Sequence, residues 1–121
     1  MTIKYRSKFE KTLGKLFEVA GVVVNYEPFK LPYVLHSTYT PDFELPNGII
    51  IEAKGVLKPS DRRKMKAVKK QHPDLDIRFV FQNAYNKLDK RSPTTYAQWA
   101  EKNGFLWAHR KVPEEWMNGT T

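Results

Sequence analysis

The chain has 121 residues, of which 21 are lysine or arginine and 13 are aspartate or glutamate, so its formal net charge at pH 7 is +8. This length suits one domain with a modest core, and the absence of cysteine excludes disulfides, zinc–thiolate sites and a cysteine nucleophile. No stretch is apolar enough for a membrane span and no signal peptide opens the chain, so we expect a cytosolic protein. The basic excess favours a nucleic-acid partner over a small-molecule substrate or cofactor.

The first predicted element is a helix that begins after Ser7. Ser7 and Glu10 have the spacing of a capping box, and the apolar positions that follow keep the helical period as far as Gly21. Extended segments are expected next over residues 22–26 and 31–35, the second of which contains a proline.

Residues 40–54 predict a β-hairpin whose register follows from its apolar residues. If residues 46–48 form a three-residue loop with a left-handed glycine, Phe43 faces Ile51 and the apolar side chains of both strands share one face. A two-residue Asn-Gly turn would scatter those side chains, so we prefer the longer loop.

In this register Asp42 faces Glu52, with the two Cβ atoms about 5 Å apart, and Lys54 lies on the same face. Carboxylates this close repel one another unless a cation lies between them, and their hard oxygen atoms suit Mg²⁺ or Mn²⁺. Such a metal serves phosphodiester hydrolysis because it acidifies water and screens phosphate. Lys54 acts either as a cation on the phosphate or as a general base. The alternative to a catalytic site is a hairpin with a solvated polar face.

A strongly basic helix is predicted directly after the hairpin, with Ser60 as its N-cap and Met65 and Val68 as a narrow buried stripe. Only Asp61 opposes the positive charges of this segment. Beside a metal site, the basic side chains of such a helix can bind the DNA phosphates on both sides of the cleavage point. The alternative is a solvated surface helix without a binding role. The residues expected to contact DNA are Lys58, Arg62, Arg63, Lys64, Lys66 and Lys69.

Three further elements complete the prediction. Residues 76–81 read as a well-buried strand, a helix is expected to open at Ser92-Pro93 and stop at Gly104, and residues 105–108 read as a short final strand. The element order predicts an α/β (mixed α+β) fold in which helices flank a central mixed β-sheet.

Several separated motifs resemble those of known nucleases. The Pro-Asp pair that ends at Asp42, followed ten positions later by Glu-x-Lys, resembles the site of restriction-endonuclease-like nucleases. The run over residues 38–48 is similar to the phage endonuclease I family, and the likeness continues at 71–78, 90–94 and 113–116.

This resemblance implies a restriction-endonuclease-like core and a structure-selective endonuclease that resolves four-way (Holliday) junctions and other branched DNA with a divalent metal. It implies that Asp42 bridges two Mg²⁺ ions, that Glu52 and the carbonyl of Ala53 bind one of them, and that Glu10 supports the other. Lys54 is then the catalytic lysine, and Mn²⁺ is expected to substitute for Mg²⁺.

The resemblance also implies a domain-swapped homodimer in the cytoplasm of a phage-infected bacterium. Residues 1–121 then form a single nuclease domain in which 1–35 is the exchanged helix–strand segment, 36–39 the bridge and 40–121 the catalytic core. The stretch before residue 38 is shorter than in the family pattern. The alternatives are a nicking, mismatch-directed or branch-directed nuclease of the same superfamily and a non-catalytic basic DNA-binding module.

Overall fold

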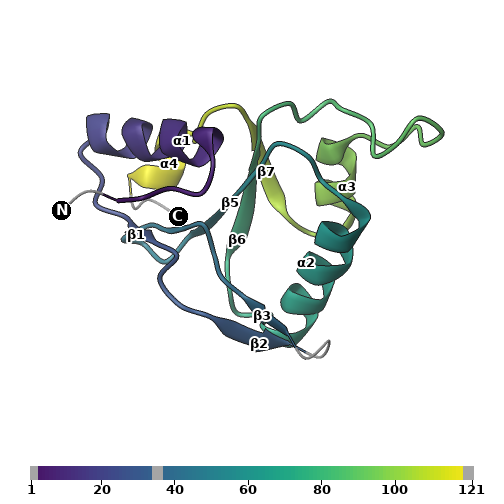
Figure 1. Ribbon diagram of the computed structural model, residues 1–121, viewed down its shortest axis with the longest axis horizontal. Helices are drawn as coiled ribbons and strands as arrows, with labels where there is room; N and C mark the ends of the chain where they lie inside the picture. The colour runs from purple at the N-terminus through teal and green to yellow at the C-terminus, as the bar shows by residue number, and fades with distance from the viewer. Residues whose placement is uncertain (1–2, 34–36, 119–121) are drawn as a thin grey trace.

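The computed structural model describes residues 3–33 and 37–118 (Figure 1). The helices are α1 (Lys8–Val19), α2 (Pro59–Gln71), α3 (Tyr96–Lys102) and α4 (Glu114–Met117). The strands are β1 (Asn25–Tyr26), β2 (Leu31–Tyr33), β3 (Ser37–Tyr39), β4 (Phe43–Glu44), β5 (Ile50–Lys54), β6 (Ile77–Phe81) and β7 (Leu106–His109).

Five strands form a mixed sheet in the spatial order β1-β4-β5-β6-β7, while β2 and β3 form a separate antiparallel ribbon. The pairs β1–β4 and β4–β5 are antiparallel, and β5, β6 and β7 run parallel. The predicted mixed fold, with helices flanking a central sheet, is therefore confirmed. None of the described helices has the length and apolar character that crossing a membrane requires.

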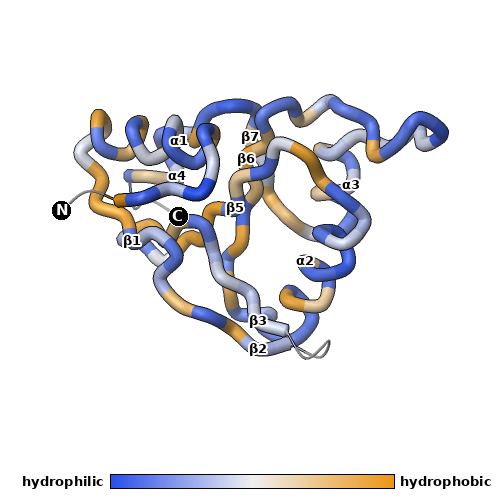
Figure 2. Tube along the Cα trace, in the orientation of Figure 1, coloured by the Kyte–Doolittle hydropathy of each residue, from blue (hydrophilic) through white to orange (hydrophobic). Residues whose placement is uncertain are grey.

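Helices cover both faces of the sheet. One core contains side chains of α2 and α3 and the other contains side chains of α1 and α4, with the sheet between them (Figure 1). Figure 2 shows the matching sequence pattern: the central strands are hydrophobic, while much of the surrounding chain is hydrophilic. Strand β5 contributes to both cores, because Ile50 packs toward α2 and α3, whereas Ile51 packs toward α1 and α4, as does Ile49 just before the strand.

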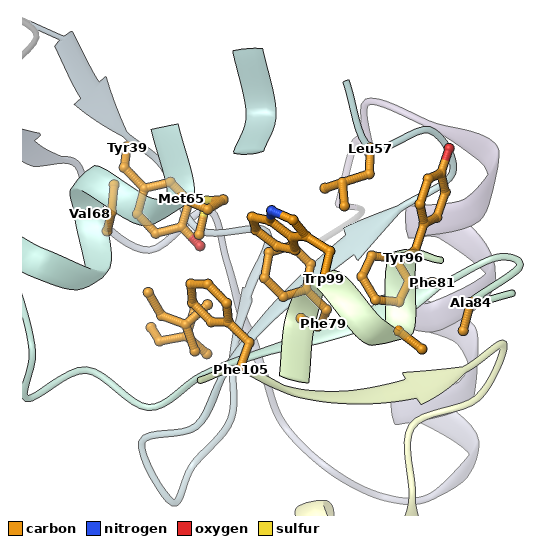
Figure 3. Close-up of a cluster of buried hydrophobic side chains, with 14 residues drawn as sticks. Tyr39, Leu57, Met65, Val68, Phe79, Phe81, Ala84, Tyr96, Trp99 and Phe105 are labelled. Carbon is orange, nitrogen blue, oxygen red and sulfur yellow. The ribbon is translucent and has the colours of Figure 1, made fainter. Parts of the chain in front are cut away.

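The core beneath α2 and α3 is rich in aromatic rings (Figure 3). Phe79 meets Trp99 edge-on at 5.7 Å and Phe105 edge-on at 5.0 Å, while Trp99 and Phe105 stack with their centroids 5.7 Å apart. This packing joins the middle of β6 to α3 and to the residue that precedes β7.

The hairpin has the predicted register. Phe43 pairs with Ile51, and the Leu45 N–H donates to the Ile49 carbonyl at 2.8 Å. Gly48 has φ +91°, the left-handed conformation that the three-residue loop requires. Asp42 and Glu52 are therefore opposite one another.

Two predicted helix starts are wrong. The N-cap of α2 is Lys58 and not Ser60, because Pro59 takes the first helical position and the Asp61 carboxylate accepts the Lys58 N–H at 3.0 Å. Helix α3 does not open at Ser92-Pro93 but at Tyr96. There Thr95 is the N-cap and forms a reciprocal capping box with Gln98.

Other boundaries moved by a few residues. The expected strand over 22–26 is reduced to β1, and the predicted strand over 31–35 is described only as far as Tyr33, since 34–36 lie outside the described residues. Helix α1 begins after Ser7 as predicted, and Gly21 follows its end with φ +72°.

Candidate active site

Three parallel strands end at one edge of the sheet, which is at the top of Figure 1. Lys54, Phe81 and His109 are the last residues of β5, β6 and β7, and they lie in register side by side. This edge of an open sheet is where ligands commonly bind, since the connecting loops leave a crevice there.

The hairpin brings Asp42 and Glu52 to this edge. Asp42 Oδ2 accepts a hydrogen bond from the Ala53 N–H at 2.9 Å, which ties the residue before β4 to the end of β5. Asp42 and Glu52 are each only 4 % exposed. The structure therefore brings together the residues that were predicted to converge from the hairpin.

Glu10 reaches the same cluster from α1 and is 7 % exposed. Its predicted capping box is only half formed. Ser7 Oγ accepts the Glu10 N–H at 3.0 Å, but Glu10 Oε1 accepts the Arg6 N–H at 3.1 Å and not that of Ser7. The carboxyl group of Glu10 also lies near enough to Asp42 to raise its pKa, so its position is more than a helix cap requires.

Burial of this acidic cluster changes its protonation. Desolvation, followed by the negative charge of Glu52 and the contact with Glu10, raises the pKa of Asp42 from 3.8 to about 9. Desolvation also raises the pKa of Glu52, although Lys54 and a tyrosine hydroxyl oppose the shift. At neutral pH the cluster must hold a proton or attract a cation.

Lys54 lies between two acids. Its Nζ is 3.1 Å from Asp61 Oδ1 and 3.7 Å from Glu52 Oε2. Burial lowers the pKa of Lys54, but Glu52 and then Asp61 raise it, and the net shift is upward. Lys54 is therefore a cation at neutral pH in this arrangement.

Asp61 was not among the predicted site residues. In sequence it is one acid within a basic run, but its position at the start of α2 places it against Lys54. Its other oxygen accepts the Lys58 N–H, so one carboxylate both caps α2 and orients the lysine. No local sequence pattern indicates this contact, because it depends on how α2 packs beside β5.

Two tyrosines, also missed from the sequence, each hold one carboxylate. Tyr39 Oη donates to Glu52 Oε1 at 2.6 Å, and Tyr26 Oη donates to Glu10 Oε1. Burial, followed by the charge of Glu52, raises the pKa of Tyr39, and burial with the bond to Glu10 raises the pKa of Tyr26 to about 12. Both hydroxyls are therefore hydrogen-bond donors at neutral pH.

The donor atoms of the cluster suit a hard divalent cation. Within residues 3–33 and 37–118, no three His, Cys, Asp or Glu side chains already surround a single point as a metal shell. The carboxylates of Asp42, Glu52 and Glu10 nevertheless supply the oxygen ligands that such an ion prefers. A bound cation would also replace the proton that the buried cluster otherwise needs.

The predicted DNA-binding residues on α2 do not all face this site. Lys64 lies near enough to Glu52 to lower its pKa, whereas Arg62 Nη1 donates to the Leu57 carbonyl at 2.9 Å. The side chain of Lys69 does not point to the acidic cluster: its Nζ donates to the Gly104 carbonyl and lies 4.9 Å from the centroid of the Phe105 ring. Lys58, Arg63 and Lys66 are exposed.

Comparisons with known proteins identify the family to which this chain is similar. A family model described as phage endonuclease I matches residues 1–121. The chain is 45% identical over 116 residues to "Endonuclease I" of Escherichia phage T7, an alignment that covers 93% of this chain and 78% of the relative. It is 46% identical over 112 residues to "Endodeoxyribonuclease 1" of Enterobacteria phage T3, covering 90% and 74% respectively. The resemblance predicted from the motifs is confirmed.

Proposed function

Because the chain belongs to the phage endonuclease I family, it is a DNA-hydrolysing enzyme, and we propose that it resolves four-way junctions and other branched DNA. The observation that carries the proposal is the convergence of three buried carboxyl groups and Lys54 at one sheet edge. A protein that only bound DNA would gain nothing from acids at this position, since they repel phosphate unless a cation compensates them.

The nuclease family implies a divalent metal, and we propose Mg²⁺, with Mn²⁺ as a substitute and two ions in each site. Asp42 would contact both ions, Glu52 and the Ala53 carbonyl would hold one, and Glu10 would support the other. When bound, the ions supply positive charge that stabilises the phosphate and favours deprotonation of the attacking water. Tyr39 and Tyr26 orient their carboxylates toward this role.

Lys54 Nζ lies 3.1 Å from Asp61 Oδ1 and 3.7 Å from Glu52 Oε2, and this position between two acids favours a role as a cation over a role as a general base. We propose that its ammonium group contacts the scissile phosphate and stabilises the charge that develops in the transition state. In the absence of DNA, the hydrogen bond from Lys54 Nζ to Asp61 Oδ1 keeps the ammonium group oriented.

We further propose that the enzyme is a homodimer in which residues 1–35 are exchanged across the bridge 36–39, leaving 40–121 as the catalytic core. Support comes from the family and from the connection between α1 and the hairpin, which contains the short strands β1, β2 and β3 in place of a tight turn. A two-fold dimer also suits the pseudo-two-fold shape of a four-way junction. We place its action in the cytoplasm of the infected host.

The direct test compares junction, duplex and single-stranded DNA of identical sequence, with and without Mg²⁺. Cleavage of the junction alone, only with metal, is expected. Preferred nicking of mismatched or singly branched duplex would indicate another nuclease of the superfamily. Tight binding without cleavage under any metal would contradict the proposed catalytic site.

A further inference from the structure

Tyr85 is a large aromatic side chain that is 60% exposed and yet firmly supported. It lies in the loop that joins β6 to α3, which extends at the upper right of Figure 1 and is mostly hydrophilic in Figure 2. The His109 ring lies beneath it at 4.8 Å with a 35° tilt, and Trp107 meets it edge-on at 6.0 Å. We call these three residues the aromatic platform.

Hydrogen bonds fix the platform from several sides. The Tyr85 N–H donates to Asn83 Oδ1 at 3.0 Å, and the Ala84 N–H donates to His109 Nδ1 at 3.1 Å. Ala84 itself is fully buried beside Phe81 and Tyr96 (Figure 3). Because these contacts already hold the Tyr85 side chain in place, the side chain loses little conformational entropy when a ligand binds to it.

The platform is on the same edge and the same face of the sheet as Lys54. His109 is in register with Phe81, which is in register with Lys54, and the Gln82 N–H donates to the Lys54 carbonyl at 2.9 Å. Two strand spacings put the His109 backbone roughly 10 Å from that of Lys54. At about 3.4 Å of rise per stacked nucleotide, that separation corresponds to about three nucleotides.

Positive charge accompanies the platform. Arg110 follows His109 in a left-handed conformation (φ +67°), held by bonds from its N–H to the Phe81 carbonyl and from its Nε to the Gln82 carbonyl. Its side chain is exposed, as are those of Lys87 and Lys111. An exposed aromatic face with cations beside it is complementary to a DNA strand, whose phosphates and bases alternate.

We propose that the aromatic platform stacks on a nucleobase of the DNA substrate within about three nucleotides of the scissile phosphate. The proposal rests on the proposed function and adds a second contact to the catalytic cluster. Branched DNA offers bases at the branch point whose stacking is interrupted, and stacking on an aromatic ring tolerates every base. The platform would therefore help to place the branch relative to Lys54 without reading sequence.

The test combines protein variants with junctions that lack single bases. Binding is titrated in EDTA to an intact junction and to junctions with one abasic site at each of three positions on either side of the cleaved bond. For the wild type, one position should weaken binding by about 5-fold to 100-fold when its base is removed. Tyr85→Ala should lose the same factor on the intact junction and become insensitive to that position.

Two control variants separate stacking from general effects. Tyr85→Phe keeps the ring and should behave as wild type. Leu106→Ala removes a 56% exposed apolar side chain from β7 and should also bind as wild type. The proposal is wrong if Tyr85→Ala binds the intact junction within 2-fold of wild type, or if it remains as sensitive as wild type to the same abasic position.

A photo-crosslinking experiment on the wild-type protein tests the proposal even if Tyr85→Ala folds poorly. Junctions that carry 5-iodouracil at the sensitive position should form a photo-crosslink to the peptide that contains Tyr85, and a crosslink only to α2 would contradict the platform. Mg²⁺-dependent cleavage of the same junctions is followed in parallel. If the wild type cleaves but shows no sensitive position, the platform alone is wrong, whereas absence of cleavage contradicts the proposed function itself.

Discussion

Glu52 and Glu10 both reach the site buried and both accept a hydrogen bond from a tyrosine, but the parts of the chain that hold them differ. Tyr39, the partner of Glu52, is 1% exposed and belongs to the core beneath α2 and α3. Tyr26, the partner of Glu10, is only partly buried and lies on the edge strand β1, which pairs with β4 through two residues. One carboxylate is held by a residue of the core beneath α2 and α3, and the other by a residue of an edge strand.

The residues that hydrogen-bond to the Glu10 carboxylate lie in the same segment of the chain as Glu10. Arg6 and Tyr26 both lie within residues 1–35, and Arg6 is further paired with Glu27 of the same segment at 2.6 Å. If that segment is exchanged between chains, Glu10 keeps its hydrogen bonds with Arg6 and Tyr26 in the partner's site. In the proposed dimer the site would be built from two parts, each held by its own hydrogen bonds, and Asp42, whose pKa both Glu52 and Glu10 raise, would lie between them.

The largest effect should come from removing the residues on the core side. Asp42→Ala, Glu52→Ala and Lys54→Ala should each abolish junction cleavage while leaving junction binding largely intact, because basic residues elsewhere make most phosphate contacts. Gel-shift titrations and single-turnover cleavage measure the two properties separately. Retained cleavage in any two of these variants would remove the proposed site.

Glu10→Gln tests the peripheral half by itself. The amide oxygen still accepts the Arg6 N–H and the Tyr26 hydroxyl, so the melting temperature should stay close to that of wild type. A neutral amide is a poor ligand for a hard cation, and cleavage should fall by a large factor, on the order of 100-fold or more. Full activity in this variant would leave Glu10 as a helix cap only.

The two tyrosines should differ in importance. Tyr39→Phe removes the hydrogen bond to Glu52 Oε1 at a buried position and should weaken the apparent Mg²⁺ affinity by about 10-fold to 100-fold. Tyr26→Phe should have the smaller effect, since the partly buried position admits water as a replacement donor. Cleavage rates over a Mg²⁺ titration give both values, and an equal or reversed order would contradict the distinction between the two halves.

Stability of the metal-free protein should depend on pH through Asp42. Its pKa is 3.8 in an unfolded chain and about 9 in the fold, so the folded state binds the extra proton between these values. The free energy of unfolding should therefore fall as pH rises across this window, by at most about 1.4 kcal/mol per pH unit. Asp42→Asn should flatten this slope in denaturant titrations at pH 5, 7 and 9, and an unchanged slope would show that Asp42 is not the group responsible.

The smallest effect on chemistry should come from α2. Neutralising Arg62, Arg63 and Lys66 together should weaken binding to all DNA shapes and reduce the salt dependence of log affinity by about one unit for each phosphate that these side chains no longer neutralise. Single-turnover cleavage at saturating protein should change little. A weakening confined to one DNA sequence would indicate base readout by these residues.

The hairpin and its acids were predictable because strand alternation and turn geometry are local, so the apolar residues of both strands and the length of the loop define the register. The fold class followed from the order of elements for the same reason. Asp61, Tyr39 and Tyr26 were not predictable, because each contacts its partner only after separate elements pack. The start of α2 was misplaced because Pro59 competes with Ser60 for the helix terminus, and a proline at the first helical position prevails.

The proposal that the two halves of one site come from different chains has a direct test in complementation. Glu10→Gln and Lys54→Ala are each inactive as homodimers if both residues are required. When the two variants are unfolded and refolded together, exchange of residues 1–35 gives heterodimers with one site that contains both Glu10 and Lys54. Mixed refolding should therefore restore cleavage of one strand of a four-way junction. Refolded mixtures that contain heterodimers and remain inactive would show that Glu10 serves the site of its own chain.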